Sequence, residues 1–272
     1  MPPAVITFAF DPVVHVGDSG IRMETLALAA IVFAALILGT LIGRVTPMAG
    51  PYVPAPTLHP SDLPFLILGV VPGAVLGGRL DYALIHLDYY AAHPAAILDP
   101  TQGALGLGLA VPGAILGGAL IARLVDAPVD RWLHAAVLPM LFLLAAGKLA
   151  GVLSAAGQGA PSDLPWATAY LGDGPWSSLA AYLPSHPSQV YEAIGTLVIL
   201  VVLGVALRAE AFTRRTGSVL FVGVALWALV RGIVILTWRD SGVLGPLRAE
   251  QLVLLVVIGG SIWAINSLRK RV

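Results

Sequence analysis

The sequence contains no cysteine among its 272 residues. This absence excludes a disulfide framework, a thiolate nucleophile and a cysteine-ligated metal, so any thiol that reacts here belongs to a substrate. Charged residues make up only 11% of the chain, and positive and negative charges are equal in number. The neutral balance gives no electrostatic basis for binding nucleic acid. The low charge also leaves too few polar groups to cover a soluble fold of this size.

Long apolar runs take the place of the missing polar residues. Hydrophobic residues form 58% of the chain, and the mean hydropathy is +0.89. The first 22 residues lack the basic start of a secretory signal, so the first run is expected to be retained as a helix. We predict an all-α integral membrane protein with about seven transmembrane helices in a single domain over residues 1–272. The runs of about 20 apolar residues are 23–43, 64–86, 104–125, 132–153, 188–208, 217–238 and 249–268.

The cations between these runs predict the orientation of the chain. With seven spans, nine of them fall on one side: Arg44, Arg123, Arg131, Arg208, Arg214, Arg215, Arg269, Lys270 and Arg271. The other side holds Arg22, Arg239 and Arg248. Because cytoplasmic loops carry the excess of Lys and Arg, we expect the N-terminus outside and the C-terminus in the cytoplasm.

Two loops lie outside the membrane under this topology, at 87–103 and 154–187. The second has no Lys or Arg and is rich in Gly, Pro, Ser and Trp. It predicts a small extracytoplasmic cap at about 154–187, and its aromatic residues are expected to lie at the membrane interface. Those residues are Trp166, Tyr170, Trp176 and Tyr182. Two small-residue spacings, Gly73-x-x-x-Gly77 and Gly113-x-x-x-Gly117, would allow close helix packing.

Three cations lie inside the predicted spans, where a charge is costly and calls for a reason. They are Arg79, Lys148 and Arg231, and polar groups at the outer helix ends accompany them. If these groups converge on one cavity near the outer headgroups, the cations would suit an anionic phospholipid, since guanidinium and ammonium groups both bind phosphate. The accompanying residues are Glu24, Asp81, His186, Ser188, Gln189, Tyr191 and Glu192.

Structural explanations compete with this interpretation. Arg79 has Asp81 two residues away, and such a pair can be purely structural. Lys148 can extend to the outer interface with its charge in water. Arg231 lies too deep for that, which favours a functional role. Glu24 at a helix start is explained by the helix dipole alone. The histidines outside this region show no metal-ligand spacing, so no metal or cofactor is predicted; they are His15, His59, His86, His93 and His134.

One longer motif is specific. The segment Ser185-His186-Pro187-Ser188-Gln189-Val190-Tyr191-Glu192-Ala193 resembles the histidine–proline–serine–glutamine–aliphatic–tyrosine–glutamate motif of prolipoprotein diacylglyceryl transferases. Other pieces follow in the family's order: Gly77 to Tyr82, Tyr89 to Pro94, Gly147 to Gly159, Pro165-Trp166-Ala167, Arg231, Asp240 and Gln251. The resemblance therefore extends over most of the chain.

The resemblance implies a reaction. The family moves the diacylglyceryl group of phosphatidylglycerol onto the lipobox cysteine thiol of a prolipoprotein, forming a thioether while glycerol 1-phosphate leaves. The implied location is the bacterial cytoplasmic (inner) membrane, and the implied partners are phosphatidylglycerol or another anionic phospholipid, the prolipoprotein signal peptide and the bilayer. The resemblance makes Arg231, His186 and Lys148 candidate catalytic residues. The candidate headgroup-binding residues are Arg79, Lys148, Arg231, Gln189, Tyr191, Glu192, Gly159 and Arg239.

The chain departs from the family pattern at several polar positions. Lys148 replaces an arginine and Gly151 an asparagine, so the first keeps its charge without the bidentate fork. Pro112 stands at a histidine position and can neither take nor give a proton. If that histidine acts as a base in the family, His186 or Glu24 are the candidates to replace it here. The remaining departures are Glu24, Ala156, Ser185, Ile235 and Trp238.

Three functions remain open on the sequence. The first is a divergent diacylglyceryl transferase, which the retained cations and the motif at 185–193 favour. The second is a non-catalytic relative that binds phospholipid or a membrane partner, which the lost polar residues favour. The third is a transporter or channel, against which stands the lack of paired inverted repeats.

Overall fold

A computed structural model describes residues 5–46, 58–99, 102–172, 174–212, 217–240 and 242–269. Within these residues, seven helices are long and apolar enough to cross a membrane, which confirms the predicted number and the all-α class. They are α1 (Met23–Val45), α2 (Leu63–Ile85), α4 (Leu107–Leu124), α5 (Val129–Ala150), α6 (Ser188–Arg208), α7 (Ser218–Val234) and α8 (Ala249–Arg269). The short helix α3 (Leu87–Ala92) follows α2.

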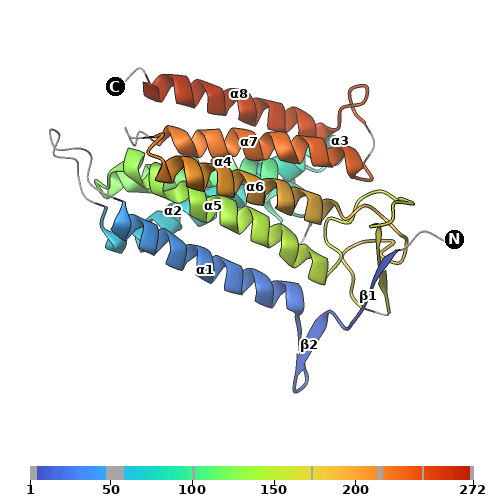
Figure 1. Ribbon diagram of the computed structural model, residues 1–272. Helices are drawn as coiled ribbons and strands as arrows, with labels where there is room; N and C mark the ends of the chain where they lie inside the picture. Colours follow the sequence, from blue (N-terminus) through green and yellow to red (C-terminus); the bar gives the residue numbers. More distant parts are fainter. Residues whose placement is uncertain are drawn as a thin grey trace.

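The long helices pack side by side as one bundle, with their chain directions alternating (Figure 1). Short 3-10 segments extend three of their ends: η1 (Pro60–Asp62), η3 (Gly151–Leu153) and η4 (Ile235–Thr237). A further one, η2 (Pro94–Leu98), follows α3. We call the end that carries residues 154–187 the cap end, and the opposite end the far end. Helices α1, α4, α6 and α8 begin at the cap end, whereas α2, α5 and α7 finish there (Figure 1).

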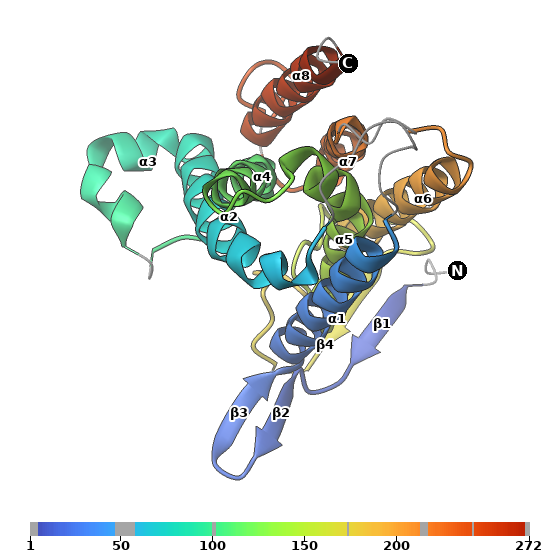
Figure 2. The same cartoon turned by 90° about the vertical axis from the view of Figure 1, so that its left-hand side faces the viewer.

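The cap contains strands that the sequence did not predict. Strand β1 (Ile6–Ala9) pairs in parallel with β4 (Thr168–Leu171), with Ile6 opposite Thr168, so the chain before α1 completes the cap. Strands β2 (Val13–Val16) and β3 (Ser19–Arg22) form a separate hairpin that projects from the bundle (Figure 2). Four-residue strands carry too little alternation to be recognised in sequence, because a period of two needs several repeats to stand out.

The interior of the bundle lies mainly between α5, α6 and α7. It contains a cluster of buried apolar side chains that includes the fully buried Trp227 together with Val137, Leu141, Leu220 and Val224. Large apolar side chains also cover the outside of the bundle, as expected where lipid rather than water surrounds the protein. Examples are Phe33, Leu76, Leu120, Val201 and Val256.

Helices α2 and α4 pack backbone against backbone along a line of glycines. A Cβ on Gly73 would collide with the carbonyl of Gly113, and a Cβ on Gly113 would collide with the carbonyl of Gly73. Gly69 and Gly117 repeat the same reciprocal contact one turn further. The predicted small-residue spacings therefore do form a helix interface, which is the geometry that such spacings permit in membranes.

Replacing Gly73 with alanine is expected to lower the free energy of unfolding by about 1–3 kcal/mol, because the added methyl has a backbone carbonyl in its place. Thermal unfolding in detergent measures the effect. The control is Gly260→Ala on α8, where a Cβ meets open space, so stability should stay the same or rise slightly through helix propensity. Equal effects of the two substitutions would contradict the close packing of α2 and α4.

Candidate functional site

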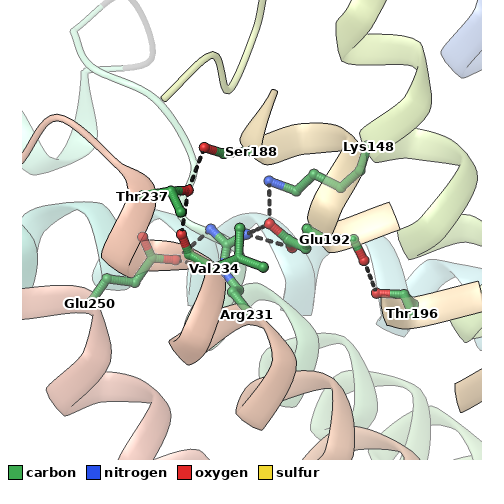
Figure 3. Close-up of polar contacts among 8 residues, drawn as sticks. All are labelled: Lys148, Ser188, Glu192, Thr196, Arg231, Val234, Thr237 and Glu250. Atoms are coloured by element: carbon green, nitrogen blue, oxygen red, sulfur yellow. Dashed lines mark hydrogen bonds and ion pairs between the residues drawn. The ribbon is translucent and has the colours of Figure 1, made fainter. Parts of the chain in front are cut away.

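Four charged side chains from four helices meet near the cap end of the bundle. Lys148 Nζ lies 3.1 Å from Glu192 Oε2, and Arg231 Nη1 lies 2.7 Å from both oxygens of the same carboxylate. Arg231 also donates from Nε to Glu250 Oε1 at 2.7 Å (Figure 3). We call Lys148, Glu192, Arg231 and Glu250 the charge cluster. It holds two cations and two carboxylates, so its formal charge is balanced.

The helix directions explain why these signs occur at these places. Lys148 lies in the last turn of α5 and Arg231 in the last turn of α7. Glu250 lies in the first turn of α8, and Glu192 is one turn into α6. Cations thus stand at helix C-termini and carboxylates at N-termini, as the helix dipole favours. Because neighbouring helices alternate in direction, the four termini meet at one level.

Neighbouring groups fix the cluster in place. The Trp238 ring lies 5.0 Å from Arg231 Cζ and 5.9 Å from Lys148 Nζ, within the range of a cation–π contact to each. The hydroxyls of Ser188 and Thr237 are 2.6 Å apart and join the start of α6 to η4 (Figure 3). The start of α6 and the segment that follows α7 are therefore tied together close to the charges.

Arg79 lies in a different network from the cluster. Its guanidinium donates to the backbone carbonyls of Ile97 at 2.6 Å and Asp99 at 2.8 Å, and also to those of Ala96 and Gln102. This loop lies beside α3, on the flank of α2 that faces away from α5 and α6 (Figure 2). The expectation that three buried cations converge is therefore wrong for Arg79, because the backbone carbonyls of η2 and of the residues after it engage its donors.

Asp81 and several of the departures from the family pattern have local structural settings. Asp81 is fully buried and lies against the first turn of α4, where a Cβ on Gly106 or Gly108 would strike its carboxylate. The structure shows no ion pair between Arg79 and Asp81, so the structural explanation considered for Arg79 does not apply. Pro112 lies inside α4, Glu24 lies in the first turn of α1, and Gly151 begins η3.

Arg239 joins the cap to the end of α7. It donates from Nε to the carbonyl of Gly159 at 2.7 Å and from Nη2 to Ser185 Oγ at 3.1 Å. Gly159 in turn donates its N–H to the carbonyl of His186 at 2.7 Å, and a Cβ there would meet the Ser188 hydroxyl. Both residues, expected to bind a headgroup, thus contribute to the internal structure of the cap.

The remaining candidate residues form a second polar network beside the cluster. Trp166 Nε1 donates to the Tyr191 hydroxyl at 2.7 Å, and that hydroxyl lies 3.5 Å from His186 Nδ1. Gln189 is buried and donates to the Tyr170 hydroxyl at 3.4 Å. The side chains of the motif at 185–193 therefore belong to two different networks. Glu192 is part of the charge cluster, while His186 and Tyr191 contact the cap.

Tyr170 connects β4 to β1 and is the buried centre of the cap. Its ring stacks on Phe8 with centroids 5.0 Å apart and packs against Trp176. Burial raises the pKa of the Tyr170 hydroxyl to about 12, and the hydrogen bond from Gln189 partly offsets this. The folded cap therefore favours the protonated phenol.

The raised pKa predicts how the stability of the cap depends on pH. The contribution of Tyr170 is complete below pH 10, where the unfolded tyrosine is also protonated, and it is lost as the pH rises from 10 to about 12. At about 1.4 kcal/mol for each pH unit, the loss approaches about 2.7 kcal/mol. Tyr170→Phe should remove this part of the alkaline destabilisation, measured by hydrogen exchange of cap amides. The exposed Tyr182→Phe is the control, and equal profiles for the two variants would contradict the burial of the phenol.

Sequence reasoning missed two members of this site. Glu250 was not chosen as a candidate site residue. An acidic residue in the first turn of the last predicted span is the sequence feature that could have pointed to it. Trp238 was noted only as a departure from the family pattern, whereas in the structure its ring contacts both cations.

Seven spans, a small cap and a balanced charge cluster beneath it define a multi-pass membrane protein with a polar centre near one membrane face. The sequence profile of the family described as prolipoprotein diacylglyceryl transferase matches residues 30–266. The chain belongs to this family.

Individual relatives agree with the family match. The chain is 33% identical to a phosphatidylglycerol–prolipoprotein diacylglyceryl transferase of Nitrobacter hamburgensis, over 84% of this chain and 76% of that protein. It is 31% identical to the transferase of the same name from Bradyrhizobium diazoefficiens, over 85% of this chain and 80% of that protein. It is also 31% identical to the transferase of the same name from Cereibacter sphaeroides, over 66% of this chain and 63% of that protein.

Proposed function

We propose that this protein transfers the diacylglyceryl group of phosphatidylglycerol to the lipobox cysteine thiol of a prolipoprotein. Support comes from family membership and from the names of the relatives, which state this donor and this acceptor. The observation that carries the proposal to a particular site is the charge cluster at the cap end. The cluster holds an ammonium group beside a fixed set of charges, and in this proposal the phosphate of the donor lipid binds there.

The cluster residues have different parts in this proposal. Arg231 is occupied by two carboxylates, so its part is to hold Glu192 and Glu250 in place. Lys148 is the more accessible cation, with 19% of its side chain exposed against 4% for Arg231. Its ammonium is the group that contacts the phosphate of the donor, where a charge fixed before reaction stabilises the departing phosphate. His186 and Tyr191 face the acceptor from the second network.

We also propose that the cap end faces the outside of the cytoplasmic membrane. Arg44, Arg123 and Arg208 end their helices at the far end, and Arg131 lies in the first turn of α5 there. The positive-inside rule then places the far end in the cytoplasm. The cations Arg214, Arg215, Lys270 and Arg271 lie outside the described residues. Cysteine labelling of single-cysteine variants at Ser177 and Glu210 tests this orientation, since the chain has no native cysteine.

A second candidate function is favoured by one observation. The guanidinium groups of Arg79, Arg231 and Arg239 all donate to groups within the protein, which leaves fewer open donors for a phosphate than the sequence suggested. A non-catalytic relative that binds phospholipid or a membrane partner would fit such a site.

Complementation separates the two functions. The chain is expressed in a bacterial strain depleted of its own transferase, and lipidation of a reporter lipoprotein is followed by its mobility and mass. Transfer predicts restored lipidation and growth. Normal membrane insertion of the chain without any lipidated reporter would favour the non-catalytic function. Lys148→Gln is the matched variant, and it should insert normally but fail to lipidate the reporter.

A further inference from the structure

The segment that follows α2 leaves the bundle sideways at the cap end. Helix α3 and the 3-10 turn η2 project from the end of α2, away from the other long helices, which are seen nearly end-on in Figure 2. We call residues 86–99 the side segment. Most of it belongs to the loop at 87–103, which the topology predicted from the sequence places outside the membrane. Its surface, however, carries large apolar side chains.

The lipid-facing surface of α2 leads directly to the side segment. Leu76, Leu80 and Leu84 occur at every fourth residue of α2, so they lie along one face of the helix, and all three are exposed. Leu87 comes three residues later at the start of α3 and is 59% exposed, and Leu98 in η2 is 86% exposed. A lipid-facing row of leucines that is followed at once by two more indicates that lipid also covers the side segment.

The side segment is fixed to α2 on its inner side. Tyr90 is buried in a small apolar cluster with Ala83 of α2 and Ala96 of η2. Arg79 donates to the backbone carbonyls of η2 and of the residues after it, and its Cζ lies 5.5 Å from the centroid of the Tyr90 ring. The exposure of the two leucines therefore belongs to a segment that is held in place, and a loosely attached loop does not explain it.

Tyrosine and histidine rings give the side segment polar edges. The His86 ring stacks on Tyr82 with centroids 4.1 Å apart, and the His93 ring stacks on Tyr89 at 4.7 Å. Each Nδ1 also lies close to the backbone carbonyl oxygen of its stacking partner, at 2.9 Å for His86 and 3.1 Å for His93. Rings that combine an apolar body with a polar edge suit the boundary between lipid and water.

We propose that the side segment lies in the membrane interface at the cap end, with Leu87 and Leu98 among the acyl chains and the tyrosine–histidine pairs at the level of the headgroups. Its partner is the lipid of the surrounding bilayer. The segment contains no Lys or Arg, so apolar contact holds it there and attraction to anionic headgroups does not. It anchors the cap end of α2, and with it the closely packed α2–α4 pair, at a fixed depth. This inference does not depend on the proposed transfer reaction.

The depth of the segment can be measured directly because the chain has no native cysteine. The full-length variants Leu87→Cys and Leu98→Cys carry a nitroxide spin label in phosphatidylcholine vesicles. Collisions of the label with oxygen, which dissolves in lipid, are compared with collisions with a water-soluble nickel chelate. Both labels should lie about 5–10 Å below the headgroups. The references are Val201→Cys on the exposed apolar surface of α6, for the lipid interior, and Ser177→Cys in the cap, for water.

Three results would overturn the proposal. Access of the nickel chelate to either label as free as at Ser177 would place the segment in water. Labels shielded from both oxygen and the chelate would mean that protein, either a second copy or another chain, covers the leucines. Insertion that occurs only after phosphatidylglycerol is added to the vesicles would mean that headgroup charge positions the segment. None of these results decides whether the chain transfers lipid, which complementation tests separately.

Discussion

Replacing Arg231 with methionine is expected to abolish transfer and to lower the free energy of unfolding by about 3–5 kcal/mol. The substitution leaves Glu192 with Lys148 as its remaining cation and leaves the Glu250 carboxylate buried without its partner. Removing one member of a buried ionic set costs far more than the net value of the set, because the other member keeps its desolvation penalty. Thermal unfolding and size-exclusion chromatography in detergent measure the loss.

Two further variants make this result specific. Arg123→Met removes an exposed arginine from the last turn of α4 at the far end, and its effect should stay within about 0.5 kcal/mol. Combining Arg231→Met with Glu250→Met also removes the carboxylate that the single variant leaves unmatched, and Lys148 stays paired with Glu192. This double variant should regain most of the lost stability but none of the activity. A double variant no more stable than the single one would contradict the pairing seen in the structure.

Glu192→Gln is expected to have the next largest effect, because Glu192 is the one carboxylate that contacts both cations. The amide keeps the size of the side chain but leaves Lys148 and Arg231 with Glu250 as the only counter-charge in the cluster. Loss of hydrogen bonds to a charged group predicts a stability decrease of about 1.5–3 kcal/mol. Transfer should fall by at least about 100-fold, since the position of Lys148 depends on this contact.

The matched control for this second prediction is Glu210→Gln, an exposed acid that follows α6 at the far end. It should leave stability and transfer unchanged. Transfer by Glu192→Gln at the rate of the unmodified protein would show that the cluster has no part in the reaction. A large effect of Glu210→Gln would show that charge alone, without the cluster geometry, decides the outcome.

The bundle was predictable because a membrane simplifies the relation between sequence and structure. Backbone groups in lipid are satisfied within a helix, so a run of about 20 apolar residues has one plausible structure. The sequence run at 188–208 coincides with α6, and the run at 249–268 differs from α8 by one residue. The small strands β1 and β4 are separated by more than 150 residues, and no local pattern predicts their pairing.

The candidate site was predicted in part. Lys148 and Arg231 were selected because an intramembrane charge demands a reason, and the structure brings these two together through Glu192. The cost of a charge does not reveal which partner compensates it. For Arg79 the partners are loop carbonyls, and for Arg231 they include Glu250, so one expected cation leaves the site and one unexpected acid enters it. Helix direction explains which partner occurs where. The cations lie at the C-termini of α5 and α7, and the carboxylates lie near the N-termini of α6 and α8, as the helix dipole favours.

The most direct test of the account is transfer by the purified protein in vesicles that contain phosphatidylglycerol and a lipobox peptide, with the thioether product detected by mass spectrometry. The account predicts a diacylglyceryl-peptide adduct with the unmodified protein and with Arg123→Met, and no adduct above background with Lys148→Gln. Adduct formation by Lys148→Gln at the unmodified rate, or no adduct from a folded unmodified protein, would contradict the central claim that the charge cluster is the site of diacylglyceryl transfer.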